Sequence, residues 1–409
     1  MGENESMKEL VQTDFTVEKG AESVAQAVDA KVPMDSATVI DNLLGERNLL
    51  SKQLDELRLD AEKHKAFTES VVLTRENLEY QPYIDGPPVP QGKETLYKQA
   101  CSADGVTIDS WFDTWINHIT ENNKVYDFKA LSVEQELAKF AYMPCIVAGS
   151  GPSLRVNAKY LKERGNIPLV SCLHNFGYFE DLGCPADYYM NLDAGPITIE
   201  EMSQGGTQSP EHYWETTKDR TLVTAITGNP ELLKKWKGKI LFFSVVAPAK
   251  KFTDAVSEIT DFHIHFSVGG NTLGACLYMA KAILGCNPIA YIGADFCFGH
   301  NHKFHSWDSP YDKQYSGLTP AIDVFGLPVK TWASYYNFKC WFEYIACGGS
   351  GNQPGDYVNC TEGGILGAYR EGNIKQIRQV PLAMFLWPYT LHKKQSELLK
   401  SKETFQFLF

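Results

Sequence analysis

The sequence has no apolar run approaching the roughly 18 residues that a membrane-spanning helix needs. Its opening residues, MGENESMKEL, contain neither a basic stretch nor an apolar core, so we expect no secretory signal. Its ten cysteines are scattered singly, without a C-x-x-C pair or zinc-finger spacing. That usage is typical of reduced thiols rather than of a disulfide scaffold. We therefore expect a cytoplasmic protein that does not act at a membrane.

Positive charge is also scarce. The chain carries 38 Lys and Arg against 50 Asp and Glu, and residues 1–80 alone hold 17 acidic and 9 basic side chains. Because no basic stripe is present, we expect no nucleic-acid partner. The length of 409 residues is enough for two or three domains, and the acidic excess marks residues 1–80 as a separate arm.

The region before residue 141 is expected to be mainly helical. In the acidic arm, leucines recur at heptad steps after Ser36. This pattern fits a short coiled coil or an amphipathic helix packed on its own domain. In the first case, residues 1–80 would form a homo-oligomer or a larger assembly. Residues 81–93 are Pro-rich and predict a stiff, extended linker, and residues 94–140 predict a helical subdomain.

From residue 141 to 385, short apolar runs alternate with helical stretches. This order predicts an α/β protein with a Rossmann-like, doubly wound, mostly parallel sheet covered by helices on both faces. The expected strands are Cys145–Ala148, Pro168–Cys172, Tyr188–Asn191, Thr221–Thr224, Ile240–Phe243 and Ile289–Ile292. The expected helices cover 154–163, 230–237 and 271–284, and a helical tail is expected at 386–409.

The first expected strand ends in a glycine turn, Gly149-Ser150-Gly151-Pro152-Ser153. Such a turn can bring backbone N–H groups close to a phosphate at the positive end of the following helix. Pro152 suits a first helical turn, because its missing N–H would have no partner there. A plain strand-to-helix turn without a ligand explains the motif equally well.

Other polar residues stand at the ends of the expected strands and before a helix; they are Asn175, Asp193, Gly269, Gly270, Asn271, Thr272 and Asp295. In parallel sheets, ligands bind beyond the carboxyl ends of the strands. Two acids beside two glycine turns predict that Asp193 and Asp295 bind a divalent metal together with a phosphorylated ligand. The alternative for both acids is a helix cap or a turn.

The segment after Asp295 is rich in histidine and aromatic residues. His300, His302 and His305 permit metal binding, although a general acid or base, or a phosphate contact, is the simpler role for one of them. The aromatic side chains of residues 296–358 predict a lid or helical insert, in which one or two rings stack on a base or sugar. They are Trp307, Tyr311, Tyr315, Trp332, Tyr335, Tyr336, Trp341 and Tyr344.

Five short motifs follow one another along the chain: VAGSGPSL at 147–154, NLD at 191–193, GGNT at 269–272, YIGAD at 291–295 and NCTEGG at 359–364. In this order, over residues 140–385, the chain resembles the 6-hydroxymethylpterin diphosphokinase-like family. That family includes the central domain of flagellar motility accessory factors, which are nonulosonate glycosyltransferases. The glycine turn and Asn175-Phe176 are also distantly similar to the nucleotide site of bacterial sialyltransferases that use CMP-sialic acid.

The resemblance implies a nucleotide- or nucleotide-sugar-dependent transferase. It implies ATP with Mg²⁺ on Asp193 and Asp295, or a CMP-sugar, as the donor system, and a small molecule or glycan as the acceptor. It also implies catalytic roles for His305, Asp295 and Glu362. The nucleotide site would comprise Gly149, Ser150, Gly151, Pro152, Ser153, Asn175, Gly269, Gly270, Asn271, Thr272 and Thr361.

Two other functions compete with the transferase. The N-terminal 140 residues, which match nothing in the family, fit a non-catalytic structural or assembly protein, virion-associated if the gene belongs to a phage. An NAD-dependent oxidoreductase is disfavoured, because Leu154 replaces the third glycine of G-x-G-x-x-G and no acid ends the second strand.

Overall fold

The computed structural model describes residues 78–88, 93–246, 249–299, 303–307, 317–349 and 355–390. The chain divides into two compact units, Met1–Leu78 and Glu79–Phe409, and the elements below belong to the second. The predicted heptad helix and nearly all of the acidic arm lie outside the described residues, so these expectations and the predicted assembly stay predictions.

Within the described residues, the centre of the second unit is a nine-stranded sheet in which every neighbouring pair is parallel. Its order is β14-β11-β8-β2-β3-β4-β5-β6-β7. The strands are β2 (Cys145–Ala148), β3 (Leu169–Cys172), β4 (Tyr188–Asn191), β5 (Thr221–Ala225), β6 (Lys239–Val245), β7 (His265–Phe266), β8 (Ile289–Ile292), β11 (Tyr357–Asn359) and β14 (Ile377–Gln379). The predicted α/β class and parallel sheet are confirmed.

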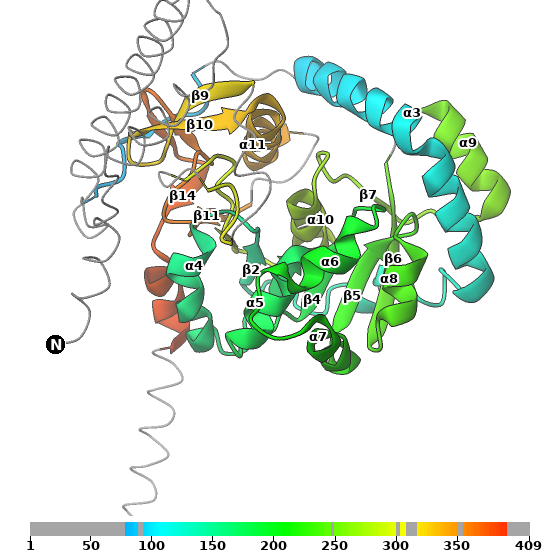
Figure 1. The fold of residues 1–409 in the computed structure, drawn as a ribbon. Helices are drawn as coiled ribbons and strands as arrows, with labels where there is room; N and C mark the ends of the chain where they lie inside the picture. Colours follow the sequence, from blue (N-terminus) through cyan, green and yellow to red (C-terminus); the bar gives the residue numbers. More distant parts are fainter. Residues whose placement is uncertain are drawn as a thin grey trace, which may run out of the picture. The chain divides into compact units, whose positions relative to one another are not determined.

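Helices cover both faces of this sheet (Figure 1). Strand side chains alternate between two apolar clusters, so that Val147 packs with α10 on one face and Ile146 packs with α4 on the other. The helices are α3 (Lys93–Val125), α4 (Leu154–Asn157), α5 (Phe176–Asp181), α6 (Ile197–Gln204), α7 (Pro210–Thr216), α8 (Pro230–Lys235), α9 (Lys250–Ile259), α10 (Thr272–Tyr278), which continues as a π-helical turn at Met279–Ile283, and α11 (Ala333–Ala346).

The direction of winding reverses between β2 and β8. From β2 the chain builds β3 to β7 in one direction, then returns to place β8, β11 and β14 on the other side of β2. In doubly wound sheets, ligands bind beyond the carboxyl ends of the strands at this reversal. The glycine turn after β2 and the Gly293-Ala294-Asp295 segment after β8 therefore stand where a ligand is expected.

The region expected as a helical subdomain at 94–140 is only partly helical. Helix α3 ends at Val125, and a 3₁₀ turn follows at Val133–Glu136. Helix α3 runs alongside α9 (Figure 1). The buried Asn122 amide donates to the carbonyls of Ile226 and Gly228. Helix α3 is thus anchored to the loop that follows β5.

The aromatic insert forms a hairpin of β9 (Leu318–Ile322) and β10 (Pro328–Trp332), followed directly by α11. A small sheet joins β1 (Tyr83–Ile84), in the region expected as a linker, to β13 (Gly372–Ile374) and β12 (Ala368–Tyr369). Residues 382–390 are helical, so the C-terminal helix begins before the expected residue 386. No helix in the described part of the chain is long and apolar enough to cross a membrane.

Candidate functional site

A cavity lies at the carboxyl ends of β2, β3, β4 and β8, where the winding reverses. Eight of the predicted site residues line it: Gly149, Ser150, Gly151, Asp193, Asn271, Thr272, Asp295 and His305. Other lining residues include Cys172, His174, Asn191, Thr198, Glu201, Phe304, Tyr335 and Phe338. The topology therefore brings together residues from six separate parts of the sequence.

The glycine turn after β2 is packed against the turn after β8. A Cβ on Gly149 would lie 2.5 Å from the Gly293 carbonyl oxygen, and one on Gly293 would lie 2.4 Å from the Gly149 carbonyl oxygen. The N–H of Gly149 donates to the carbonyl of Ile292, and that of Gly151 donates to the carbonyl of Gly293. Glycine is needed here for close backbone contact.

This geometry differs from the phosphate cradle that the turn predicts. Helix α4 begins only at Leu154, so Pro152 lies in the turn before it. The Ser153 hydroxyl donates to the Asp295 carboxylate at 2.8 Å, and the Ser153 N–H donates to the same group. A carboxylate therefore stands at the N-terminus of α4, where the sequence predicts a phosphate, and the N–H groups of Gly149, Gly151 and Ser153 have partners within the protein.

The second glycine turn is shaped by aromatic rings of α11. Gly269 and Gly270 have φ angles of 60° and 81°, which favour glycine. A Cβ on Gly269 would meet the Trp341 ring at 2.4 Å, and one on Gly270 would meet the Phe338 ring at 3.0 Å. These two glycines lie beneath the rings, outside the set that lines the cavity.

Four other predicted site residues support the cavity from outside it. The Asn175 amide donates to the Gly149 carbonyl, and Pro152 lies in the same turn. The Thr361 hydroxyl accepts the N–H of Ala294. Glu362 has a φ of 57°, and its carboxylate accepts the N–H of Leu382 at the start of the C-terminal helix. The structure thus does not bring Glu362, predicted as catalytic, into the cavity.

Two histidines meet at one side of the cavity. The rings of His174 and His305 have centroids 4.9 Å apart, and both rings lie near Trp307. Ser306 holds this segment to the first glycine turn, donating its N–H to the Ser150 carbonyl and its hydroxyl to the Gly151 carbonyl. Burial lowers the pKa of His174 to about 4, and burial together with His174 lowers the pKa of His305 to about 3. Both imidazoles are therefore neutral at pH 7.

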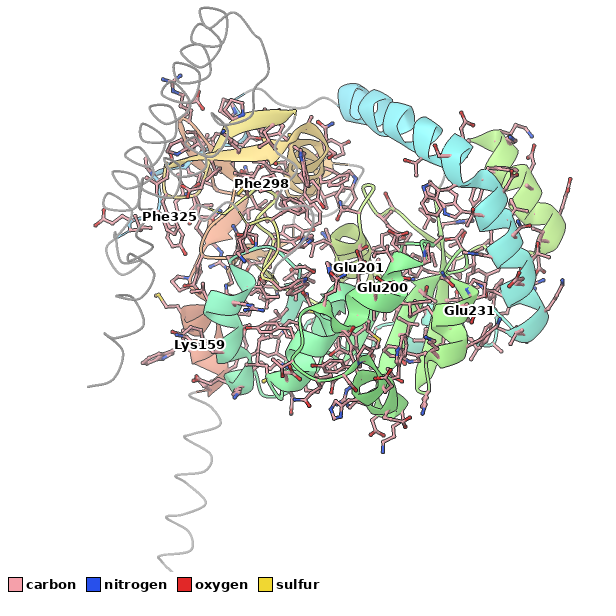
Figure 2. All side chains as sticks on the ribbon, in the orientation of Figure 1. Lys159, Glu200, Glu201, Glu231, Phe298 and Phe325 are labelled. Carbon is pink, nitrogen blue, oxygen red and sulfur yellow. The ribbon has the colours of Figure 1, made fainter. Side chains whose placement is uncertain are left out.

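Two carboxylates face the cavity from the segment after β4. Asp193 is exposed and accepts the N–H of Gly195 at 2.7 Å. Glu201 lies one turn after Thr198 on α6, and both line the cavity. Burial, together with the Asp193 charge, raises the pKa of Glu201 to about 7. Figure 2 labels Glu201 and its exposed neighbour Glu200 on this helix.

The aromatic insert supplies one wall of the cavity. Phe304, Tyr335 and Phe338 line it, while Trp332 packs on Phe298 and Phe304. The remaining predicted aromatics of this region that the structure describes are Trp307, beside the histidines, and Tyr336, Trp341 and Tyr344, on α11. His300, His302, Tyr311 and Tyr315 lie outside the described residues.

The charged side chains among the described residues that line the cavity are all acidic. None of the described residues that line it is a lysine or an arginine, whereas Asp193, Glu201 and Asp295 are acidic. In the described part of the chain, no group of three or more His, Cys, Asp or Glu side chains is placed to hold a metal ion. A metal that takes all its ligands from the protein therefore does not fit these residues.

Two titratable residues that line the cavity, His174 and Glu201, were given no role from the sequence alone, although both left a signal there. His174 is the second residue after β3, at the carboxyl edge of the sheet. Glu201 lies on α6, the helix that follows Asp193. It comes three residues after Thr198, which places Thr198 and Glu201 on one face of that helix. The two hydrogen bonds from Ser306 to the first glycine turn could not be predicted, because a single serine forms no sequence pattern.

Residues 114–301 match the model of a known family, described as 6-hydroxymethylpterin diphosphokinase MptE-like. This confirms the predicted resemblance, although with other bounds than 140–385, because the match begins at residue 114, within α3, and ends at residue 301. The expectation that the N-terminal 140 residues match nothing in the family is therefore wrong for residues 114–140. The matched segment holds both glycine turns, Asp193 and Asp295, whereas His305, Thr361 and Glu362 lie beyond its end. The match supports a transferase-like function.

The chain is also similar to a solved structure of a MAf glycosyltransferase from Magnetospirillum magneticum AMB-1, with 13% sequence identity and a TM-score of 0.44. The match covers 69% of this chain and 42% of that one, so the chain spans less than half the length of that protein. No curated protein matches the sequence significantly.

Proposed function

We propose that this protein is a nucleotide- or nucleotide-sugar-dependent transferase whose donor binds in the cavity at the carboxyl ends of β2, β3, β4 and β8. The observation that carries the proposal is that the first glycine turn converges with Asn271, Thr272, Asp193, Asp295 and His305 at the point where the sheet reverses its winding. The family match over 114–301 supports the same class of chemistry.

The charge of the cavity determines how a phosphorylated donor would bind. Three carboxylates and no described lysine or arginine line the cavity, so a polyphosphate alone would be repelled. A divalent cation removes this repulsion. Mg²⁺ usually keeps several waters and takes phosphate oxygens, and so needs only one or two protein carboxylates. Asp193 and Asp295, which both line the cavity, fit this role. When bound, Mg²⁺ would stabilise negative charge on the phosphates.

The chain's own residues would orient the donor and activate the acceptor. Asn271 caps α10 by accepting the N–H of Gly274 at 2.9 Å, which places Asn271 and Thr272 at the positive end of that helix and on the cavity wall. The neutral His305 ring would exchange hydrogen bonds with the donor phosphates or the acceptor.

Glu201 is the proposed general base, because Glu362, predicted as catalytic, does not line the cavity. Its raised pKa of about 7 lies near the working pH, which suits proton transfer. In a diphosphokinase, the acceptor hydroxyl oxygen would bond to the β-phosphorus of ATP, AMP would leave, and Glu201 would take the hydroxyl proton. In a glycosyltransferase, the same hydroxyl would bond to the anomeric carbon as CMP leaves.

Calorimetric titration tests the proposal. ATP, CTP and CMP are titrated into the full chain with Mg²⁺ and with a chelator. We expect at least one nucleoside triphosphate to bind in the presence of Mg²⁺ and to bind more weakly in the presence of the chelator. Binding of ATP favours the diphosphokinase, and binding of CTP and CMP favours the glycosyltransferase. If no nucleotide binds under either condition, the proposal is wrong.

A matched pair of variants then tests the general base. Glu201→Gln removes the proposed base, and Glu200→Gln removes its exposed neighbour on α6. With the donor that binds, we expect Glu201→Gln to slow turnover about 100-fold or more while donor affinity stays within a few-fold of wild type. Equal turnover in the two variants would exclude Glu201 as the base.

A further inference from the structure

The wall of the cavity formed by Phe304, Tyr335 and Phe338 contains no ionisable group apart from the Tyr335 phenol. The rings of Phe304 and Tyr335 lie perpendicular, with centroids 4.7 Å apart, and those of Tyr335 and Phe338 are 5.4 Å apart. Phe304 is buried, whereas Tyr335 and Phe338 are half-buried. Part of each α11 ring is therefore accessible from the cavity.

The wall is held in place independently of any ligand. Behind it, α11 carries an ion pair between Lys339 and Glu343 at 2.8 Å, with both side chains 1% exposed. Glu343 also accepts the N–H of Gly367 at 2.8 Å. On the cavity side, Phe338 packs on Gly270, next to Asn271. A preformed surface of this kind loses little entropy when a ligand binds.

Other parts of the cavity lining are polar and uncharged. The Asn191 amide and the Thr198 hydroxyl line the cavity, and their oxygens accept hydrogen bonds from N–H donors. A flat aromatic ring with N–H groups on its edge suits both parts of the lining, because its faces stack on aromatic side chains and its edge donates to amide and hydroxyl oxygens.

The wall lies outside the segment that matches the family model. That segment ends at residue 301, whereas the three rings belong to residues 304–338. The residues that bear the glycine turns and the two aspartates are thus covered by the match, and the aromatic wall is supplied by this chain's insert.

We propose that Tyr335 and Phe338 stack on the nucleobase of the donor and thereby hold it in the cavity. This inference rests on the proposed function, because it assumes that the cavity binds a nucleotide. It assigns the insert a role in donor binding, and it assigns α11 the task of placing two rings beside the second glycine turn.

A first test uses the unmodified full chain. The affinity of the nucleoside triphosphate that binds is compared with that of ribose 5-triphosphate, which lacks the base, both with Mg²⁺. Because stacking of a base on aromatic side chains is worth roughly 1–3 kcal/mol per base, we expect the base to improve affinity about tenfold or more. Equal affinities would overturn the inference and leave the proposed function standing.

A second test removes the rings. Tyr335→Leu and Phe338→Leu keep an apolar side chain but no aromatic face, and Tyr335→Phe keeps the ring. We expect each leucine variant to bind nucleotide about tenfold more weakly and ribose 5-triphosphate as wild type does. Tyr335→Phe should bind nucleotide as wild type does. Tyr336→Leu, on the same helix but outside the cavity lining, is the control.

The outcomes separate the two proposals. If the wild-type chain binds no nucleotide, both fail. If it binds nucleotide and both leucine variants bind equally well, only the stacking inference fails. If a leucine variant loses affinity for both ligands, the ring supports the fold rather than the base, and the inference is overturned for that residue.

Discussion

Several of the predicted site residues pack around the cavity, and fewer of them line it than the motifs suggest. Gly151 is an example, because it allows the Asp295 carboxylate to reach the start of α4. Thr361 and Glu362 are others, since their side chains bind backbone N–H groups behind the cavity. The motif residues thus gather at one cavity, although several of them stabilise it from outside.

Gly151→Ala should destabilise the protein. Its Cβ would lie 2.1 Å from the Asp295 carboxylate and 2.7 Å from the Gly293 carbonyl oxygen, so either the turn or Asp295 must move. We expect a loss of about 1–3 kcal/mol in the free energy of unfolding, measured by urea denaturation. Ser150→Ala, in the same turn, should stay close to wild type. Equal stability of the two variants would contradict the tight packing of Gly151 against Asp295 and Gly293.

Glu201 should make stability depend on pH above pH 4.5. Its pKa is raised in the folded state from 4.5 to about 7, so the fold favours the protonated acid. This contribution is fully present below pH 4.5 and is lost as the pH rises through about 7. Between pH 5 and 8, the Tm of wild type should fall relative to that of Glu201→Gln, as followed by circular dichroism. Glu200→Gln should give a curve parallel to wild type.

At the scale of elements, α11 has one face that lines the cavity and another that carries a buried ion pair. Phe338 faces the cavity, while the next residue, Lys339, lies within 3.6 Å of the Tyr369 ring centroid and pairs with Glu343. Tyr369 donates its hydroxyl to the same carboxylate. This pair ties the insert to the loop before β12, and thus sets where the aromatic wall stands.

Lys339→Met should be strongly destabilising. It leaves the Glu343 carboxylate buried without its cation, and removing one partner of a buried pair costs about 3–5 kcal/mol. The double variant Lys339→Met/Glu343→Gln removes the charge but keeps an oxygen for the Gly367 N–H, so it should regain part of this loss. Urea denaturation measures both. A single variant as stable as wild type would show that the pair is not isolated from water.

At the scale of the whole molecule, buried groups link distant segments and make the fold sensitive to acid. Glu136 bonds to Lys139, Tyr188 and Lys239, which joins the segment before β2 to β4 and β6. Burial by itself would raise the pKa of Glu136, but these hydrogen bonds outweigh it and lower the pKa to about 2. The ionised carboxylate is therefore part of the folded structure.

Acid should unfold the protein in two overlapping ranges. The histidine pKa values, lowered from 6.5 to about 4 and about 3, favour the neutral rings in the fold, so their contribution is lost as the pH falls from 6.5 towards 3. The Glu136 contribution is lost between pH 4.5 and 2. A His174→Gln/His305→Gln variant should show a smaller fall in Tm between pH 6.5 and 4 than wild type. If the Tm of this variant falls with pH as steeply as that of wild type, the lowered histidine pKa values do not contribute to acid sensitivity.

Much of the central sheet could be predicted because its strands are short, mostly apolar runs. The bounds of β2, β4 and β8 agree with the sequence prediction, since all four residues of each are buried. Strands β7, β11 and β14 were missed because two or three residues carry no periodic signal. The place of the site followed from the rule that polar residues after parallel strands meet at one edge.

The sequence by itself determined the α/β class, the edge of the sheet that holds the site and the family resemblance, because apolar periodicity and glycine-rich turns act locally. Only the tertiary structure decided which motif residues face the cavity. That depends on neighbours far apart in the chain: Asp295 reaches Ser153 across the turn after β2, and Glu362 turns towards Leu382. The same packing decides that Tyr335 and Phe338, among the aromatic residues of the insert, line the cavity, which no local pattern could specify.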